Sequence, residues 1–148
     1  MSVEVLTTVS PASNRPILTR NGLADADLAH LPALATQAFD SYHLLPLEQR
    51  QRIVRKALEL IAENQDVLAR ELTEQMGRPI SYATKEITTA VARGQYLLRI
   101  SGDALQDTDG EPEKGYRRFI KKLPVGPVLV LFAWNVRAVS PPLLAGAD

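Results

Sequence analysis

The chain has 148 residues, of which 45% are hydrophobic, 23% charged and 5% aromatic, and its 17 basic and 17 acidic side chains cancel. This composition is typical of a globular domain and excludes disordered and fibrous proteins. Zero net charge argues against a sequence-wide attraction to nucleic acid or anionic lipid. The absence of cysteine excludes disulfides, thiolate metal sites and a cysteine nucleophile within these residues.

No targeting or membrane segment is recognisable in the sequence. Residues 1–10 have no basic residue ahead of an apolar run, as an export signal would, and they are not rich in arginine. The longest uninterrupted apolar run, Val128 to Trp134, is far shorter than the ~20 residues of a membrane-spanning helix. We therefore expect a soluble, cytoplasmic protein with no membrane partner.

The first 22 residues predict a short β-hairpin. A β-prone run at Val3–Val9 is followed by a turn at 10–14 and a second run at Ile17–Thr19. Residues 24–39 are rich in Ala and Leu at helical spacing. Pro32 removes one backbone donor there and is expected to break or kink that helix.

Residues 24–102 are predicted to be helical, most clearly from Pro46 to Glu63. The apolar residues of that stretch recur at i, i+3, i+4 and i+7 and define an amphipathic helix: Val54, Ala57, Leu58 and Ile61. A second helix is expected to begin with Asp66 as its cap and to end at Gly77, where a left-handed residue and the following Pro79 stop it.

A third helix is predicted to follow at once and to end near Gly102. Its apolar stripe is Ile80, Ala83, Ile87, Val91, Gly94 and Leu98. Gly94 either weakens this helix or marks close packing against a neighbouring element.

The pattern changes to that of strands over 116–135. Residues 103–115 are acidic and rich in turn formers, which predicts a solvated connection, and Tyr116–Leu123 predicts a highly charged strand. After a turn at 124–127, Val128–Phe132 is apolar at every position, as in a strand covered on both faces of a parallel sheet. We therefore predict an α/β fold: helices, one parallel strand and an incomplete sheet, in a single incomplete domain of residues 1–148.

The residues just after this strand are the first candidates for function. In open α/β sheets, ligands bind beyond the carboxyl ends of the strands, which is where Ala133, Trp134 and Asn135 fall. An Asn amide there can donate a hydrogen bond to a developing oxyanion, a contribution of about 3 kcal/mol in enzymes. The alternative is structural: Trp134 fills a core and Asn135 turns the chain.

The stretch from Pro124 to Asn135, PVGPVLVLFAWN, closely resembles the segment that enters the cofactor domain of NAD(P)-dependent aldehyde dehydrogenases. Ala38-Phe39, the run from Leu45 to Ile80, and Glu86 also resemble the N-terminal helices of that family. The resemblance therefore spans about residues 7–135.

The resemblance implies an α/β oxidoreductase that converts aldehydes to carboxylic acids with NAD or NADP. It implies that Asn135 serves the oxyanion hole and that Phe132, Ala133 and Trp134 lie along the dinucleotide. The catalytic Cys and Glu of the family, its glycine-rich cofactor turn and its ribose-binding segments have no counterpart among these 148 residues. Because this chemistry needs a thiolate and a base that activates water, we expect the chain to be a truncated form that is inactive by itself.

Two further interpretations stay open. The chain could be a non-catalytic partner that assembles, as a homo- or hetero-oligomer, with aldehyde dehydrogenase-like chains through its exposed apolar strand. It could also be a mis-spliced product without function.

The remaining polar patterns favour structural roles. The basic residues Arg117, Arg118, Lys121 and Lys122 around Phe119 fit a charged edge strand better than a nucleic-acid surface. His30 and His43 are too far apart to predict a metal pair, and no metal site is expected. Glu71 and Glu74, beside Arg70 and Arg78, are interpreted as a solvated helix face.

Overall fold

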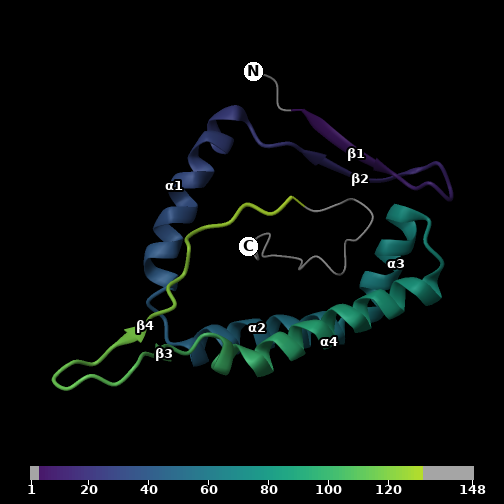
Figure 1. The fold of residues 1–148 in the computed structure, drawn as a ribbon. Helices are drawn as coiled ribbons and strands as arrows, with labels where there is room; N and C mark the ends of the chain where they lie inside the picture. The colour runs from purple at the N-terminus through teal and green to yellow at the C-terminus, as the bar shows by residue number, and fades with distance from the viewer. Residues whose placement is uncertain (1–3, 132–148) are drawn as a thin grey trace.

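The computed structural model describes residues 4–131, which form a mostly helical structure with two small hairpins (Figure 1). The elements follow in the order β1 (Val5–Val9), β2 (Pro16–Asn21), α1 (Asp25–Tyr42), α2 (Leu47–Glu63), α3 (Gln65–Met76), α4 (Ile80–Ala104), β3 (Thr108–Asp109) and β4 (Phe119–Ile120).

The predicted N-terminal hairpin is confirmed. Strands β1 and β2 pair antiparallel, and the register is irregular near the turn, between Thr8 and Val9. Buried Ser10 holds the turn together, because its hydroxyl oxygen accepts hydrogen bonds from the N–H groups of Ala12 at 3.3 Å and Ser13 at 3.4 Å. Asn14 adopts a left-handed conformation with φ 54°, which asparagine tolerates better than most residues.

Helix α1 runs through Pro32 without interruption, so the expected break is wrong. Proline removes the single N–H that would bind the carbonyl four residues earlier, and its ring crowds that carbonyl, but the other backbone bonds of the helix remain available. The Thr36 hydroxyl donates to the Pro32 carbonyl at 2.9 Å. No residue of α1 is buried.

The core lies where α3 packs on α4, with α2 running alongside α4 (Figure 1). Its buried members are few and small: Ala69, Leu72, Ala83 and Ile87. Ile61, Leu68 and Met76 are half-buried against it, whereas Val54 and Ile80, which the sequence placed on the predicted apolar stripes, are exposed. At Gly94 an added Cβ would lie 2.5 Å from Leu58 Cδ2, which confirms that this glycine marks close packing, here between α2 and α4.

The C-terminal end of α3 matches the prediction, but its N-terminal cap does not. The helix ends at Gly77, whose φ of 69° is left-handed and whose N–H donates to the Thr73 carbonyl at 2.8 Å, as expected. The predicted cap at Asp66 is wrong, because α3 begins at Gln65 after Asn64 and no side chain caps it. Asp66 lies in the first turn, where its charge still favours the helix dipole.

The C-terminal strands differ most from the prediction. The strand expected at Tyr116–Leu123 is reduced to β4, which pairs antiparallel with β3 inside the stretch predicted to be a connection. Residues 121–131 form neither helix nor strand, so no parallel strand is seen in the described part of the run beginning at Val128. A strand that is apolar on both faces needs paired neighbours and covering layers, and residues 4–131 supply neither.

Glycine at position 77 is required by both backbone conformation and space. In Gly77→Ala, a left-handed alanine and a Cβ 3.0 Å from Pro11 Cγ should lower the free energy of unfolding by about 1–2 kcal/mol. In the control Gly102→Ala, nothing lies within 4 Å of the new Cβ in a helix, and stability should rise by about 0.5–1 kcal/mol. Urea unfolding followed by circular dichroism measures both, and equal shifts would contradict this explanation.

Candidate functional site

The four residues predicted to serve the oxyanion and the dinucleotide, Phe132, Ala133, Trp134 and Asn135, lie outside the described residues. The structure describes residues 121–131, which directly precede them and are called the leading segment below, and the helices before that segment. The geometry of these parts determines what the described chain offers to a site.

The leading segment is attached to the end of α4. The Lys122 ammonium donates to the Ala104 carbonyl at 2.9 Å. Carbonyls in the last turn of a helix have no intrahelical partner, and the helix dipole places negative potential there. The bond therefore fixes the start of the leading segment at the carboxyl end of α4.

Gly126 allows the leading segment to change direction between Pro124 and Pro127. Its φ of 130° lies in the region that L side chains rarely adopt, and no atom lies within 4 Å of the position of a Cβ. The restriction here is one of backbone conformation and not of space.

The apolar side chains of the leading segment are uncovered on both of its faces. Val128 is 76% exposed, Leu129 85% and Leu131 86%, while Val130 is 47% exposed. Side chains at consecutive positions of an extended chain point to opposite faces, so a single neighbour could not cover them all. The segment therefore requires cover that residues 4–131 do not provide.

An open depression of about 520 Å³ lies on the second half of α1 and is lined by Ala35, Ala38, Phe39, Ser41, Tyr42 and Leu45. No charged group lines it, and the Ser41 hydroxyl already donates to the Ala38 carbonyl at 3.0 Å. His43, the C-cap residue of α1, stacks on the Phe39 ring at 4.8 Å between ring centroids. The depression suits apolar side chains better than phosphate groups.

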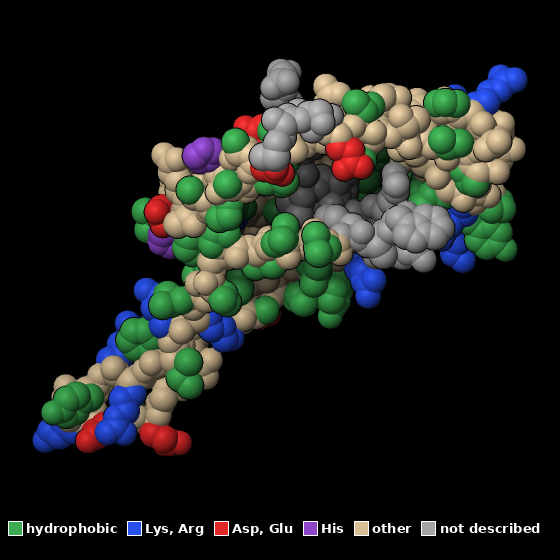
Figure 2. All heavy atoms as spheres, turned by 90° about the horizontal axis from the view of Figure 1, so that it is seen from above, with side chains coloured by type: hydrophobic (Ala, Val, Ile, Leu, Met, Phe, Trp, Pro, Cys, Tyr) green, Lys and Arg blue, Asp and Glu red, His purple; other side chains and the backbone are tan. Residues whose placement is uncertain are grey.

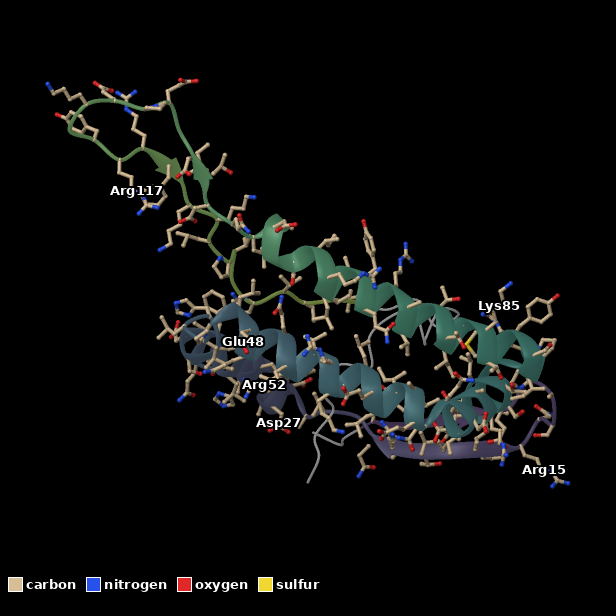
Figure 3. The ribbon with its side chains drawn as sticks, turned by 90° about the horizontal axis from the view of Figure 1, so that it is seen from below. Arg15, Asp27, Glu48, Arg52, Lys85 and Arg117 are labelled. Atoms are coloured by element: carbon tan, nitrogen blue, oxygen red, sulfur yellow. The ribbon has the colours of Figure 1, made fainter. Side chains whose placement is uncertain are left out.

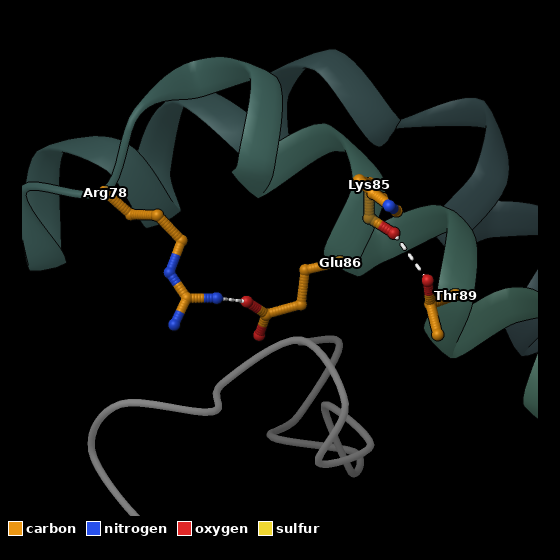
Figure 4. A network of polar contacts seen from close by, with 4 residues as sticks. All are labelled: Arg78, Lys85, Glu86 and Thr89. Atoms are coloured by element: carbon orange, nitrogen blue, oxygen red, sulfur yellow. Dashed lines mark hydrogen bonds and ion pairs between the residues drawn. The ribbon is translucent and has the colours of Figure 1, made fainter.

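An ion pair joins Arg78 to Glu86 beside the helical core (Figure 4). The Glu86 side chain is 7% exposed and that of Arg78 is 34% exposed. Arg78 directly follows the left-handed Gly77, so the pair ties the connection between α3 and α4 to the second turn of α4. Close by, the Thr89 hydroxyl donates to the Lys85 carbonyl at 2.8 Å.

The sequence interpretation missed this pair. Arg70, Glu71 and Glu74 are exposed as predicted, but the placement of Arg78 on the same solvated face is wrong. The signal was present in the sequence: Glu86 lies three residues after Ala83 and next to Ile87, on the buried stripe of α4. A carboxylate at such a position needs a cation.

The other charged side chains form exposed or local contacts. Figure 3 labels six charged side chains that are exposed: Arg15, Asp27, Glu48, Arg52, Lys85 and Arg117. In the basic run, the Arg117 guanidinium lies 5.0 Å from the centre of the Phe119 ring, and Arg118 pairs with Glu113. These contacts hold the β3–β4 hairpin itself together.

Residues 4–131 contain neither a cluster of metal ligands nor a helix suited to crossing a membrane. No three His, Asp or Glu side chains gather there as metal ligands would. None of the helices in that range combines the length and the hydropathy that crossing a bilayer demands.

The chain is similar to known proteins over nearly all of its length. The model of the aldehyde dehydrogenase family matches residues 2–146. The 3-sulfolactaldehyde dehydrogenase of Pseudomonas putida is 28% identical over 155 residues, covering 99% of this chain and 32% of that protein. The glutarate-semialdehyde dehydrogenase of Pseudomonas putida KT2440 is 28% identical over 153 residues, covering 97% of this chain and 31% of that protein.

A solved structure shares the fold of the described part. The succinic semialdehyde dehydrogenase of Streptococcus pyogenes, in complex with NADP+, superposes with a TM-score of 0.68 at 20% identity, over 76% of this chain and 25% of that one. The chain spans about a third of the length of the curated relatives it matches.

The ion pair between Arg78 and Glu86 should contribute measurably to stability. Arg78→Met leaves the buried carboxylate without this cation and should lower the free energy of unfolding by about 2 kcal/mol, less than for a fully buried pair because Arg78 is one-third exposed. The matched control is Arg52→Met, which removes an exposed contact of 3.9 Å with Glu48 and should cost less than about 0.5 kcal/mol. Equal losses in urea unfolding would contradict a structural role for the pair.

Proposed function

The chain belongs to the aldehyde dehydrogenase family, and on that premise we propose that it forms the N-terminal part of an NAD(P)-linked enzyme that oxidises aldehydes to carboxylic acids. The observation that carries the proposal is the family match over residues 2–146. Residues 1–148 then constitute one incomplete domain of that enzyme.

The proposed substrates are aldehydes that carry a second, anionic group. The two curated relatives described above act, by their names, on 3-sulfolactaldehyde and glutarate semialdehyde, which bear a sulfonate and a carboxylate. This substrate class is supported by relatedness alone, because the described residues contain no group that would select the anion.

In this proposal the described residues provide a support for the motif that follows them. The core between α3 and α4, together with the Arg78–Glu86 pair, stiffens the helical layer, and Lys122 fixes the leading segment at the end of α4. By family resemblance, the Asn135 amide donates to the substrate oxyanion. Phe132, Ala133 and Trp134 line the dinucleotide, which accepts a hydride when bound.

The 148-residue chain should not oxidise aldehydes by itself. It contains no cysteine, so no thiolate is available to attack the aldehyde carbon. Purified chain incubated with NAD or NADP and with glutarate or succinate semialdehyde should give no increase in absorbance from reduced cofactor. Turnover above that of a heat-treated sample would overturn this part of the proposal.

A chimera tests the proposed function directly. These 148 residues replace the matching third of the Pseudomonas putida glutarate-semialdehyde dehydrogenase, which supplies the rest of the enzyme. The chimera should reduce NAD or NADP in the presence of glutarate semialdehyde. A chimera that elutes at the size of the parent enzyme and gives no reduced cofactor would contradict the proposal.

Asn135→Ala in the chimera should lower kcat by about 10²–10³, the usual cost of removing an oxyanion donor. The control Asn21→Ala changes an exposed residue at the end of β2 and should leave kcat unchanged. A rise in KM with unchanged kcat would contradict the oxyanion role, because an oxyanion donor acts mainly in the transition state.

A further inference from the structure

The sequence contains one asparagine that is directly followed by glycine, Asn21 at the end of β2. The backbone nitrogen after an asparagine can attack the side-chain amide carbon, and glycine favours this attack because no Cβ crowds the nitrogen. Asn21 is exposed, so water can reach the product of the attack. The chemistry of a self-modification site is therefore present in this dipeptide.

The attacking nitrogen is engaged in the folded hairpin. The Gly22 N–H donates to the Glu4 carbonyl at 2.7 Å, at the open end of the β1–β2 hairpin. The nitrogen must lose its proton before it attacks, and an amide proton held in such a bond reaches solvent only when the structure opens locally. The bond to Glu4 therefore blocks the reaction while the hairpin end is closed.

The extended backbone of β2 opposes the reaction as well. Asn21 lies opposite Val5 in the antiparallel register. In a strand, the side chain stands roughly perpendicular to the chain direction, whereas the nitrogen of the next residue lies along it. A five-membered ring that joins the Asn21 Cγ to the Gly22 nitrogen requires the backbone at Asn21 to leave this extended form. Local opening of the hairpin removes both obstacles.

Little burial holds this end of the hairpin closed. Val5 and Leu6 are 59% and 54% exposed, and Figure 2 shows hydrophobic side chains, in green, at the surface of the face that is seen from above. Among the described elements, β2 packs extensively on β1 alone. A two-stranded hairpin without further cover is marginal in water, so its open end should separate readily.

We propose that Asn21 is a deamidation site and that opening of the β1–β2 hairpin sets the rate of its reaction. The Gly22 nitrogen loses its proton to water and forms a bond to the Asn21 Cγ, the bond between Cγ and Nδ2 breaks, and ammonia leaves. Water then adds to either carbonyl carbon of the cyclic imide and opens the ring, which gives isoaspartate or aspartate. The net change replaces an amide –NH2 by –OH, and the new carboxyl is ionised at neutral pH.

The product changes the link between the hairpin and α1. Residues 22–24 join β2 to α1. In isoaspartate the main chain runs through Cβ and Cγ, which adds one atom to the backbone and displaces the Gly22 N–H from the Glu4 carbonyl. Because ammonia is lost, the reaction is not reversed. The modified fraction therefore records the time that the hairpin end has spent open.

Prolonged incubation of the 148-residue chain near neutral pH, followed by peptide mass spectrometry, tests the proposal. The peptide that contains Asn21 should gain about one dalton, with isoaspartate among its products. The peptides that contain Asn14 and Asn64 are internal references, because a residue with a side chain follows each of them. They should stay unchanged. In urea, which opens the hairpin, the reaction at Asn21 should be about tenfold faster or more.

Two proline variants separate the effect of the hydrogen bond from that of the sequence. The bond from Gly22 to Glu4 marks a hydrogen-bonded pair, so the alternation of an antiparallel ladder gives Leu6 the next hydrogen-bonded position of β1 and Val5 a position whose N–H points away from β2. Leu6→Pro removes a donor of the ladder beside the site and should speed deamidation about tenfold. Val5→Pro is the matched control and should change the rate less than about twofold.

Hydrogen exchange of the Gly22 amide, followed by NMR, gives an independent readout of the opening. In each variant, the exchange rate and the deamidation rate should change by the same factor, because both require the same opening. The proposal is wrong if Asn21 stays unmodified in urea, if it reacts equally fast in the native chain and in urea, or if the two proline variants react at the same rate. Faster deamidation of Leu6→Pro with unchanged exchange at Gly22 would also contradict it.

Discussion

The packing of α3 against α4 is the interaction on which the rest of the described structure depends. Ala69 and Leu72 from one helix meet Ala83 and Ile87 from the other, and these four are the buried apolar residues of the described chain. Because two of them are alanines, the helices approach closely and bury little area in doing so. The left-handed turn between them and the adjoining ion pair fix the direction in which α4 leaves, and α4 in turn carries α2 and the start of the leading segment.

The small extent of this core explains why α1 and residues 121–131 bury less apolar surface than α3 and α4. Apolar burial contributes roughly 25 cal/mol per Å², and ordering the backbone costs about 1–2 kcal/mol per residue. Around α3 and α4 the gain is concentrated, whereas α1 and residues 121–131 are ordered with little burial to offset that cost.

The helices could be predicted from the sequence because their signals are local. The i, i+3, i+4 stripe of α4 and the Gly77 stop depend on neighbours within two turns. The strand expected from Val128 onward was predicted from its composition within an incomplete sheet, but strand formation there depends on chain segments that residues 4–131 do not contain. Likewise, the contact of Arg78 with Glu86 joins residues eight positions apart through a turn, and composition alone gave Arg78 the appearance of a surface residue. The positions expected to bear the chemistry, 132–135, fall outside the described range, so the sequence remains the source for their roles.

The two prolines of the leading segment have a consequence during protein synthesis. While residues 123–131 are uncovered, such an apolar stretch risks joining other nascent chains in intermolecular β-sheets. Pro124 and Pro127 lack the N–H donors that a growing sheet requires, and the backbone of Gly126 departs from the extended form. These three residues are therefore placed as gatekeepers beside the most apolar run of the chain, where they oppose its pairing with other chains.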